Sequence, residues 1–141
     1  MTTTDKLDSP LLAAWVVSLT ATLGALFLGE VMGRDPCVLC WYQRILMFPL
    51  PVVFGLGLWF ADTNTGRYGL ALALIGGGLA AWHLALYWGF LPEAPQPCSA
   101  TGPSCSGEAQ KIAGVPIALM SFIAFGLIAA LSFVSLRNKT T

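Results

Sequence analysis

Charged side chains are scarce in this sequence. Asp, Glu, Lys and Arg make up 10% of its 141 residues, against roughly 25% in an average soluble domain. Hydrophobic residues make up 56%, so a soluble domain of this size would lack the polar surface needed to cover its core. The formal net charge is zero, which removes the electrostatic attraction that a nucleic-acid partner would require. This composition favours a lipid bilayer as the solvent, and the length suits one domain.

Long stretches have no Asp, Glu, Lys or Arg at all, namely residues 11–29, 45–61, 68–91 and 112–136. Roughly 20 helical residues cross a hydrocarbon core about 30 Å thick, and the second run reaches that length when 41–44 are added at the interface. We therefore expect an all-α membrane protein, a single-domain four-helix transmembrane bundle with spans of about 11–29, 41–61, 68–91 and 112–136. The first run is longer than the roughly 7–15 apolar residues of a signal peptide, so we expect it to remain in the protein.

Four spans would place both termini on one side of the membrane and the two large loops, 30–40 and 92–111, on the other. The polar segment 62–67 has the composition of a tight turn, which makes the second and third spans an antiparallel hairpin. The side of the termini would carry a small excess of basic residues, in the direction of the positive-inside rule. We therefore expect both termini in the cytoplasm and both large loops outside it, in a cytoplasmic or inner membrane.

Prolines are concentrated in two places. Pro49 and Pro51 lie in the second span and are expected to kink it, which would open a pocket beside the start of that helix. The second large loop contains four further prolines, so we expect an extended segment there rather than a helix.

The sequence has four cysteines, all in the two large loops. Cys37 and Cys40 form a C-x-x-C pair before the second span, and Cys98 and Cys105 lie in the second loop. Three interpretations are open at this point. Two structural disulfides would suit an oxidising compartment. Four sulfurs could bind zinc or a soft metal, although structural zinc sites usually have more closely spaced pairs. A C-x-x-C pair is also commonly redox-active.

The residues near the first pair favour the redox interpretation. The second span is expected to begin near Cys40, which would place that sulfur at the positive end of the helix dipole. Arg44 lies one turn further on the same face, and its charge would also favour a thiolate, although an interfacial anchor is an alternative role. His83, the only histidine, lies within the third span, where it is either a functional group or a neutral residue bonded to a neighbouring helix.

Residues 36–44, Pro-Cys-Val-Leu-Cys-Trp-Tyr-Gln-Arg, resemble the signature of the DsbB family of disulfide-forming membrane oxidoreductases. The longer run 29–51 looks most like the short, BdbC-like branch of that family. Residues 114–125 resemble the fourth helix of the same branch. The resemblance covers nearly the whole chain, from the first span to the fourth.

This resemblance implies a role for each candidate residue. Cys37 and Cys40 match the pair next to a membrane quinone, ubiquinone or menaquinone, with Cys40 expected to engage the quinone ring. Arg44 matches an arginine that holds or activates the quinone, and His83 lies near the family's histidine in the third span, which makes it a second candidate for quinone binding. No resident metal is expected.

The second pair, Cys98 and Cys105, matches the pair that exchanges disulfides with a DsbA-like partner of thioredoxin fold. By position, Cys98 is the sulfur expected to form the mixed disulfide. The implied function is a thiol:quinone oxidoreductase for protein disulfide formation. The alternatives are a non-enzymatic membrane anchor with structural disulfides, a soft-metal-handling membrane protein, and a reductase of the vitamin K epoxide type. That last family usually has its C-x-x-C pair late in the chain.

Overall fold

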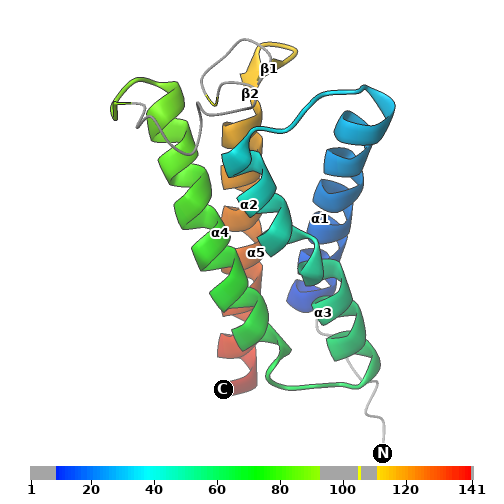
Figure 1. Cartoon of the computed structure of the whole chain (residues 1–141). Coiled ribbons are helices and arrows are strands. Elements are labelled where there is room, and N and C mark those ends of the chain that lie inside the picture. Colours follow the sequence, from blue (N-terminus) through cyan, green and yellow to red (C-terminus); the bar gives the residue numbers. More distant parts are fainter. Residues whose placement is uncertain (1–8, 93–104, 106–110, 141) are drawn as a thin grey trace, which may run out of the picture.

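The computed structural model describes residues 9–92, 105 and 111–140, and the described part is a bundle of helices with a small β hairpin at one end (Figure 1). In chain order the elements are α1 (Ser9–Leu26), the π-helical turn η1 (Phe27–Val31), α2 (Val38–Met47), α3 (Pro49–Trp59), α4 (Thr65–Tyr87), β1 (Lys111–Ile112), β2 (Val115–Pro116) and α5 (Ile117–Thr140).

Four helical segments within the described residues are long and apolar enough to cross a membrane. They are Ser9–Val31, Val38–Trp59, Thr65–Tyr87 and Ile117–Lys139. Large hydrophobic side chains are exposed along all four, which suits lipid contact and would be unfavourable in water. The expected all-α, four-helix architecture is therefore confirmed, with ends that differ by a few residues from those expected from composition.

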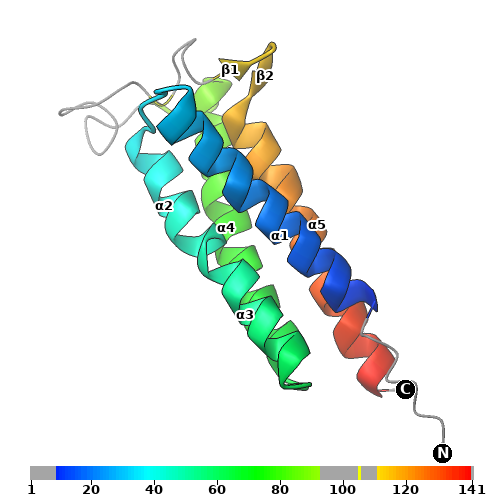
Figure 2. The same ribbon diagram turned by 90° about the vertical axis from the view of Figure 1, so that its right-hand side faces the viewer.

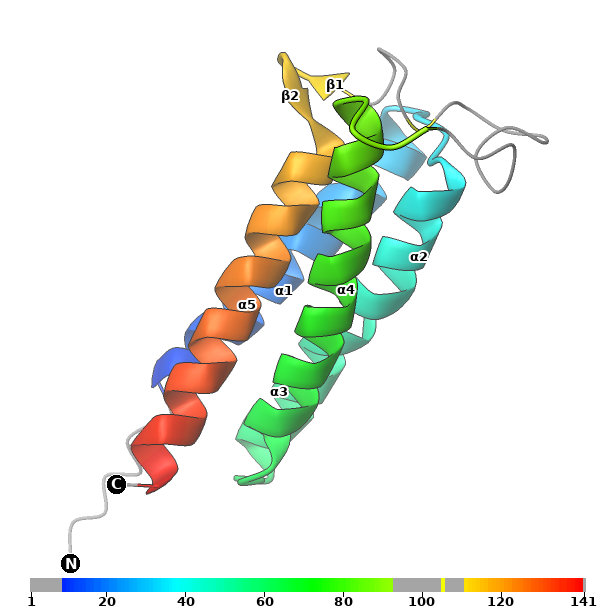
Figure 3. The same cartoon turned by 90° about the vertical axis from the view of Figure 1, so that its left-hand side faces the viewer.

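The helices run up and down along one axis. The start of α1 and the end of α5 lie at one end of the bundle, and the hairpin, the end of α4 and the start of α2 lie at the other (Figures 1 and 3). α4 packs along α5, α1 packs on α5 and on α3, and α2 packs on α4; Figure 2 shows α1 beside α5. The three described cysteines, Cys37, Cys40 and Cys105, therefore meet near the hairpin end.

Glycines allow close contact between helices in the core. A Cβ atom at Gly76 would overlap the ring of Phe125, and one at Gly69 would overlap the ring of Phe54. Both phenylalanines are almost completely buried. The first contact joins α4 to α5 and the second joins α4 to α3, in the manner of small-residue interfaces between membrane helices.

The second span is interrupted at Phe48, between the end of α2 and the start of α3. Pro49 is the first residue of α3, where its missing N–H and fixed φ are tolerated. The interruption that Pro49 and Pro51 predicted is therefore confirmed. Trp15 of α1 donates a hydrogen bond from Nε1 to the carbonyl of Pro51 at 3.0 Å, which ties the first span to the start of α3.

The turn between the second and third spans is shorter than the expected 62–67. Ala61 has a positive φ of 52°, which ends α3, and the N–H of Asp62 donates to the carbonyl of Gly57 at 2.9 Å. The side chain of Asp62 then accepts from the N–H of Asn64 at 2.9 Å. This compact arrangement lets α4 begin at Thr65.

Residues 112–116, expected to start the fourth span, belong instead to the hairpin. β1 and β2 pair antiparallel, and the two residues between them, Ala113 and Gly114, have positive φ values of 49° and 82°. Two central residues with positive φ are what a tight type I′ hairpin turn requires. An apolar run without charge cannot distinguish this hairpin from a helix, so the sequence prediction was wrong here, and α5 begins at Ile117.

Candidate functional site

Cys37 is the residue that caps α2. Its backbone is extended (φ −66°, ψ 167°), and its sulfur accepts a hydrogen bond from the N–H of Cys40 at 3.4 Å. A sulfur in this place lies at the positive end of the helix dipole. The expectation that Cys40 occupies this place is corrected, because α2 begins at Val38 and Cys40 lies inside its first turn.

The two sulfurs of the C-x-x-C pair are in contact. Neither Cys37 nor Cys40 is part of a disulfide, both are buried, and their Sγ atoms are 2.9 Å apart. The hydrogen bond with the Cys40 side chain is the largest influence on Cys37; it lowers the pKa of the Cys37 thiol to about 5, with help from His83 and against the effect of burial. Of the two sulfurs, Cys37 is the one at which negative charge is favoured by its surroundings.

His83 joins both cysteine-bearing segments. It is fully buried in α4, and its Nε2 lies 3.1 Å from the carbonyl oxygen of Cys105 and 3.8 Å from Sγ of Cys37. On its other side, Nδ1 lies 3.0 Å from the amide nitrogen of Gln43. A carbonyl oxygen only accepts hydrogen bonds, so Nε2 carries the proton, and in the neutral ring Nδ1 accepts from Gln43.

The second cysteine pair is represented here by Cys105, because Cys98 lies outside the described residues. Cys105 is disulfide-bonded and fully buried. Its sulfur, the sulfur of Cys37 and a ring nitrogen of His83 all lie within 4.8 Å of one another. Such a cluster has the spacing of a metal site, but a disulfide-bonded sulfur is not a thiolate ligand. The arrangement suits exchange between a thiolate and a disulfide instead.

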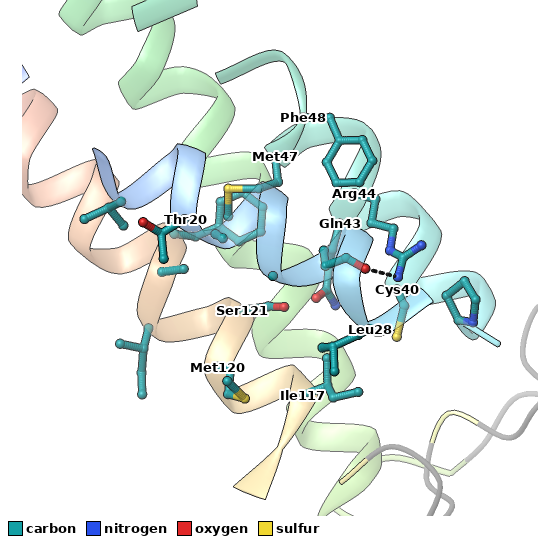
Figure 4. Close-up of a pocket in the computed structure, with 18 of the residues that line it drawn as sticks. Thr20, Leu28, Cys40, Gln43, Arg44, Met47, Phe48, Ile117, Met120 and Ser121 are labelled. Carbon is teal, nitrogen blue, oxygen red and sulfur yellow. Dashed lines mark hydrogen bonds between the residues drawn. The ribbon is translucent and has the colours of Figure 1, made fainter. Parts of the chain in front are cut away.

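A cavity of about 530 Å³ lies between α1, α2 and α5 (Figure 4). Its volume is within the range of small-molecule sites, and most of the side chains around it are apolar. Over the described residues, its lining includes Cys40 but neither Cys37 nor His83. The polar side chains on the lining are Thr20, Arg34, Asp35, Gln43, Arg44 and Ser121. Among the described cysteines, Cys40 is thus the one that lines the cavity.

Arg44 lines the cavity and is held against the first span. Its Nη2 donates to the carbonyl of Ala25 at 2.8 Å (Figure 4), and its guanidinium lies 5.5 Å from the ring centroid of Trp41. Gly29, in the π-helical turn, leaves room for the guanidinium because it has no side chain. A fixed cation therefore lies next to an apolar cavity that also contains a redox-capable sulfur.

These residues fit a quinone. Apolar walls suit its ring and tail, and the N–H groups of Arg44 suit a ring carbonyl, which only accepts hydrogen bonds. One further polar atom is available, because Oε1 of Gln43 is buried and has no hydrogen-bond partner among the described residues. Cys40 lines the same space, as a quinone-engaging sulfur would have to.

The structure brings together five of the expected site residues at the hairpin end of the bundle, and Cys98 lies outside the described residues. Those brought together are Cys37, Cys40, Arg44, His83 and Cys105. His83 is placed differently from the expectation of quinone binding, since its ring contacts the sulfur cluster and not the cavity. Gln43 was not among the site residues expected from the sequence. A polar amide three residues after Cys40, in an otherwise apolar span, could have indicated a functional contact.

Comparison with known proteins identifies the family. A family model described as "Disulfide bond formation protein DsbB" matches residues 8–135. The chain is 48% identical over 132 residues to a "Probable disulfide formation protein" of Metapseudomonas resinovorans, covering 93% of this chain and 91% of the relative. It is 40% identical over 121 residues to the "Disulfide bond formation protein C" of Bacillus subtilis, covering 84% and 86%. No solved structure gives a significant match. The chain therefore belongs to the disulfide bond formation protein DsbB family, and its four apolar helices make it a multi-pass membrane protein of that family.

Proposed function

We propose that this protein is a thiol:quinone oxidoreductase that reoxidises a DsbA-like partner of thioredoxin fold. Electrons from the partner pass through Cys98 and Cys105 to Cys37 and Cys40, and then to a membrane quinone. One observation carries the proposal: Cys37 lies beside Cys105, while its neighbour Cys40 lines the apolar cavity. The sulfurs thus form a continuous path from the second loop to the cavity.

The first part of the reaction is disulfide exchange. A thiolate of the partner attacks Cys98 in the Cys98–Cys105 disulfide, and the partner leaves oxidised after a second attack by its other thiolate. The Cys105 thiolate released in this way attacks Cys37 in an oxidised Cys37–Cys40 pair, and Cys40 is the leaving group. Attack by Cys98 on Cys105 then restores the second disulfide and leaves Cys37 and Cys40 as a dithiol. In the structure Cys105 is disulfide-bonded, whereas Cys37 and Cys40 are not, which is compatible with the last state of this sequence.

The surroundings of Cys105, Cys37 and Cys40 support this order. His83 holds the backbone of Cys105 beside Cys37, and the low pKa of Cys37 makes it a good leaving group when Cys105 is reoxidised. Cys40 faces the cavity, and Arg44 supplies a fixed positive charge on the same lining. When bound there, a quinone supplies the two-electron acceptor.

The orientation belongs to the proposal as well. Both termini would lie in the cytoplasm, and both cysteine-bearing loops would lie outside it, where a secreted dithiol partner has access. The support is that the start of α1 and the end of α5 lie at one end of the bundle, whereas the start of α2, with Cys37 and Cys40, lies at the other (Figure 1). The excess of basic residues on the side of the termini points in the same direction.

The test is an anaerobic assay with purified protein in detergent, a short-chain quinone and a reduced thioredoxin-like dithiol protein, followed by quinone absorbance. We expect turnover in the parent protein, its loss in Cys40→Ser and Cys98→Ser, and a marked decrease in Arg44→Ala. Arg67→Ala is the matched control, because Arg67 is exposed near the other end of the bundle and bonds only locally to Asn64 among the described contacts.

The alternatives give different results in the same assay. A membrane anchor with structural disulfides would keep both pairs oxidised, leave the quinone unreduced and tolerate Arg44→Ala. A soft-metal-handling protein would bind stoichiometric metal through its thiols, which elemental analysis of the reduced protein would detect. Either pattern, with no quinone reduction by the parent protein, contradicts the proposed function.

A further inference from the structure

Gln43 has an unusual place between the sulfur cluster and the cavity. Its side chain is 4% exposed and it lines the cavity. Its amide nitrogen bonds to Nδ1 of His83 at 3.0 Å, whereas its amide oxygen has no partner among the described residues. A buried oxygen without a partner is unfavourable, so this atom is a candidate for contact with a ligand.

The orientation of the amide follows from the contacts of His83. Nε2 of His83 faces the carbonyl oxygen of Cys105, which accepts and never donates, so that nitrogen carries the ring proton. Nδ1 then has a lone pair and needs a donor, and among the described residues the NH₂ group of Gln43 supplies it. The oxygen of Gln43 is therefore the atom left for the cavity, on the same lining as Arg44 and Ser121 (Figure 4).

An acceptor at this place distinguishes the two redox forms of a quinone. A quinone carbonyl only accepts hydrogen bonds, so it suits the guanidinium of Arg44 and gains nothing from the oxygen of Gln43. A hydroquinone hydroxyl can donate, and it would satisfy the unpaired oxygen. The guanidinium of Arg44 can thus donate to an oxygen of either redox form, whereas the oxygen of Gln43 can bond only to the hydroxyl of the reduced form.

We propose that Gln43 is a specificity-determining residue that accepts a hydrogen bond from the hydroxyl of the reduced ligand, so that the cavity binds the hydroquinone in preference to the quinone. The inference rests on the proposed function. Conversion of the Cys37–Cys40 dithiol into a disulfide releases two electrons and two protons, and these turn the two ring carbonyls of the quinone into hydroxyls. Preferential binding of the product form makes the bound couple a stronger oxidant toward the cysteines.

The test is equilibrium binding rather than turnover. Dissociation constants for a short-chain ubiquinone and its hydroquinone are measured by quenching of tryptophan fluorescence, with the full chain in detergent and Cys40→Ser in every variant to block electron transfer. We expect Gln43→Met to lower the preference for hydroquinone by about tenfold, equivalent to about 30 mV in the potential of the bound two-electron couple. Gln43→Glu should keep the preference, because one carboxyl oxygen still faces the cavity while a protonated one donates to His83.

Thr20→Val is the matched control, because Thr20 also lines the cavity but its hydroxyl donates to the carbonyl of Val16 in its own helix. It should leave the ratio of the two constants unchanged. Because Gln43→Met could fold poorly, a second measurement uses protein that retains Gln43. In infrared difference spectra, hydroquinone but not quinone should lower the frequency of a side-chain amide band that is missing in Gln43→Glu.

The inference is overturned if Gln43→Met weakens both ligands equally, if it weakens only the quinone, or if the amide band does not respond to the hydroquinone. These outcomes differ from a failure of the proposed function. If the proposed function is wrong, neither ligand will bind to the protein that retains Gln43, and the anaerobic assay will show no quinone reduction. Binding and turnover by the parent protein, with no change in ratio for Gln43→Met, would remove only the role of Gln43.

Discussion

The guanidinium of Arg44 lies so close to Gly29 that a side chain at position 29 would make an unusually tight contact with it. A Cβ atom at Gly29 would lie 3.1 Å from Nη2 of Arg44 and 3.2 Å from Nη1. Gly29 belongs to the π-helical turn Phe27–Val31, and π-helical turns are frequent at functional sites. The same guanidinium bonds to the carbonyl of Ala25, so its position depends on the local backbone of the first span.

Gly29→Ala should displace Arg44 and weaken quinone binding. Loss of one charge-assisted hydrogen bond, worth about 1.5 kcal/mol, would raise the KM for a short-chain quinone about tenfold. The control is Gly78→Ala, since a Cβ at Gly78 meets no described atom within 4 Å. Equal quinone KM values for the two variants would show that Gly29 is not required for the position of Arg44.

The thiolate of Cys37 should persist to low pH in the reduced protein. The pKa of Cys37 is lowered to about 5, mainly by the hydrogen bond with Cys40, whereas an ordinary thiol has a pKa of about 8.5. Because the pKa is depressed, the thiolate should be present at neutral pH and be lost only as the pH falls through about 5. The measurement is ultraviolet thiolate absorbance, taken as the difference between the parent protein and Cys37→Ser.

Cys40→Ala is the informative variant in that titration. It removes the largest cause of the shift, so the pKa of Cys37 should rise and the thiolate should be lost at a higher pH than in the parent. If Cys37 already titrates near the value of an ordinary thiol in the parent protein, the stabilising role assigned to the hydrogen bond with Cys40 is contradicted.

His83→Ala should slow exchange between the two cysteine pairs without changing the KM for quinone. His83 bonds to the carbonyl of Cys105 and contacts Cys37, but it does not line the cavity over the described residues. Removing one buried hydrogen bond, worth about 1 kcal/mol, should reduce the single-turnover exchange rate about fivefold. The rate is measured by rapid quenching and thiol alkylation. An increase in quinone KM with an unchanged exchange rate would support the quinone-binding role first expected from the sequence.

Gly76→Ala should destabilise the bundle. The added methyl group would overlap the ring of Phe125, and overpacking of this kind costs about 1–3 kcal/mol. Gly77→Ala is an adjacent control, because its Cβ would make an ordinary contact at 3.6 Å with Phe125. Thermal unfolding in detergent measures the difference. Combining Gly76→Ala with Phe125→Leu should recover part of the loss, and a Gly76→Ala protein as stable as the control would contradict the close contact.

Some boundaries of the helices could be predicted from the sequence alone, and others could not. Pro49 predicted the break in the second span because its missing N–H and ring act on its own helix. The hairpin before α5 was not predicted, since Ala113 and Gly114 lie in an apolar run whose composition also suits a membrane helix. The sequence predicted that the second span begins near Cys40, whereas α2 begins at Val38 and Cys37 is its cap.

By itself, the sequence determined that this protein has four apolar helices and that both loops with cysteine come to one end of the bundle. Membrane spans depend on length and composition within one segment, and the two spans between the cysteine-bearing loops bring both loops to the same side. Only the tertiary structure decided that His83 contacts the sulfurs, that Cys40 faces the cavity and that the amide of Gln43 lies between them. Those contacts join α2, α4 and the second loop, and they depend on the rotation and depth of each helix, which a pattern within one segment does not encode.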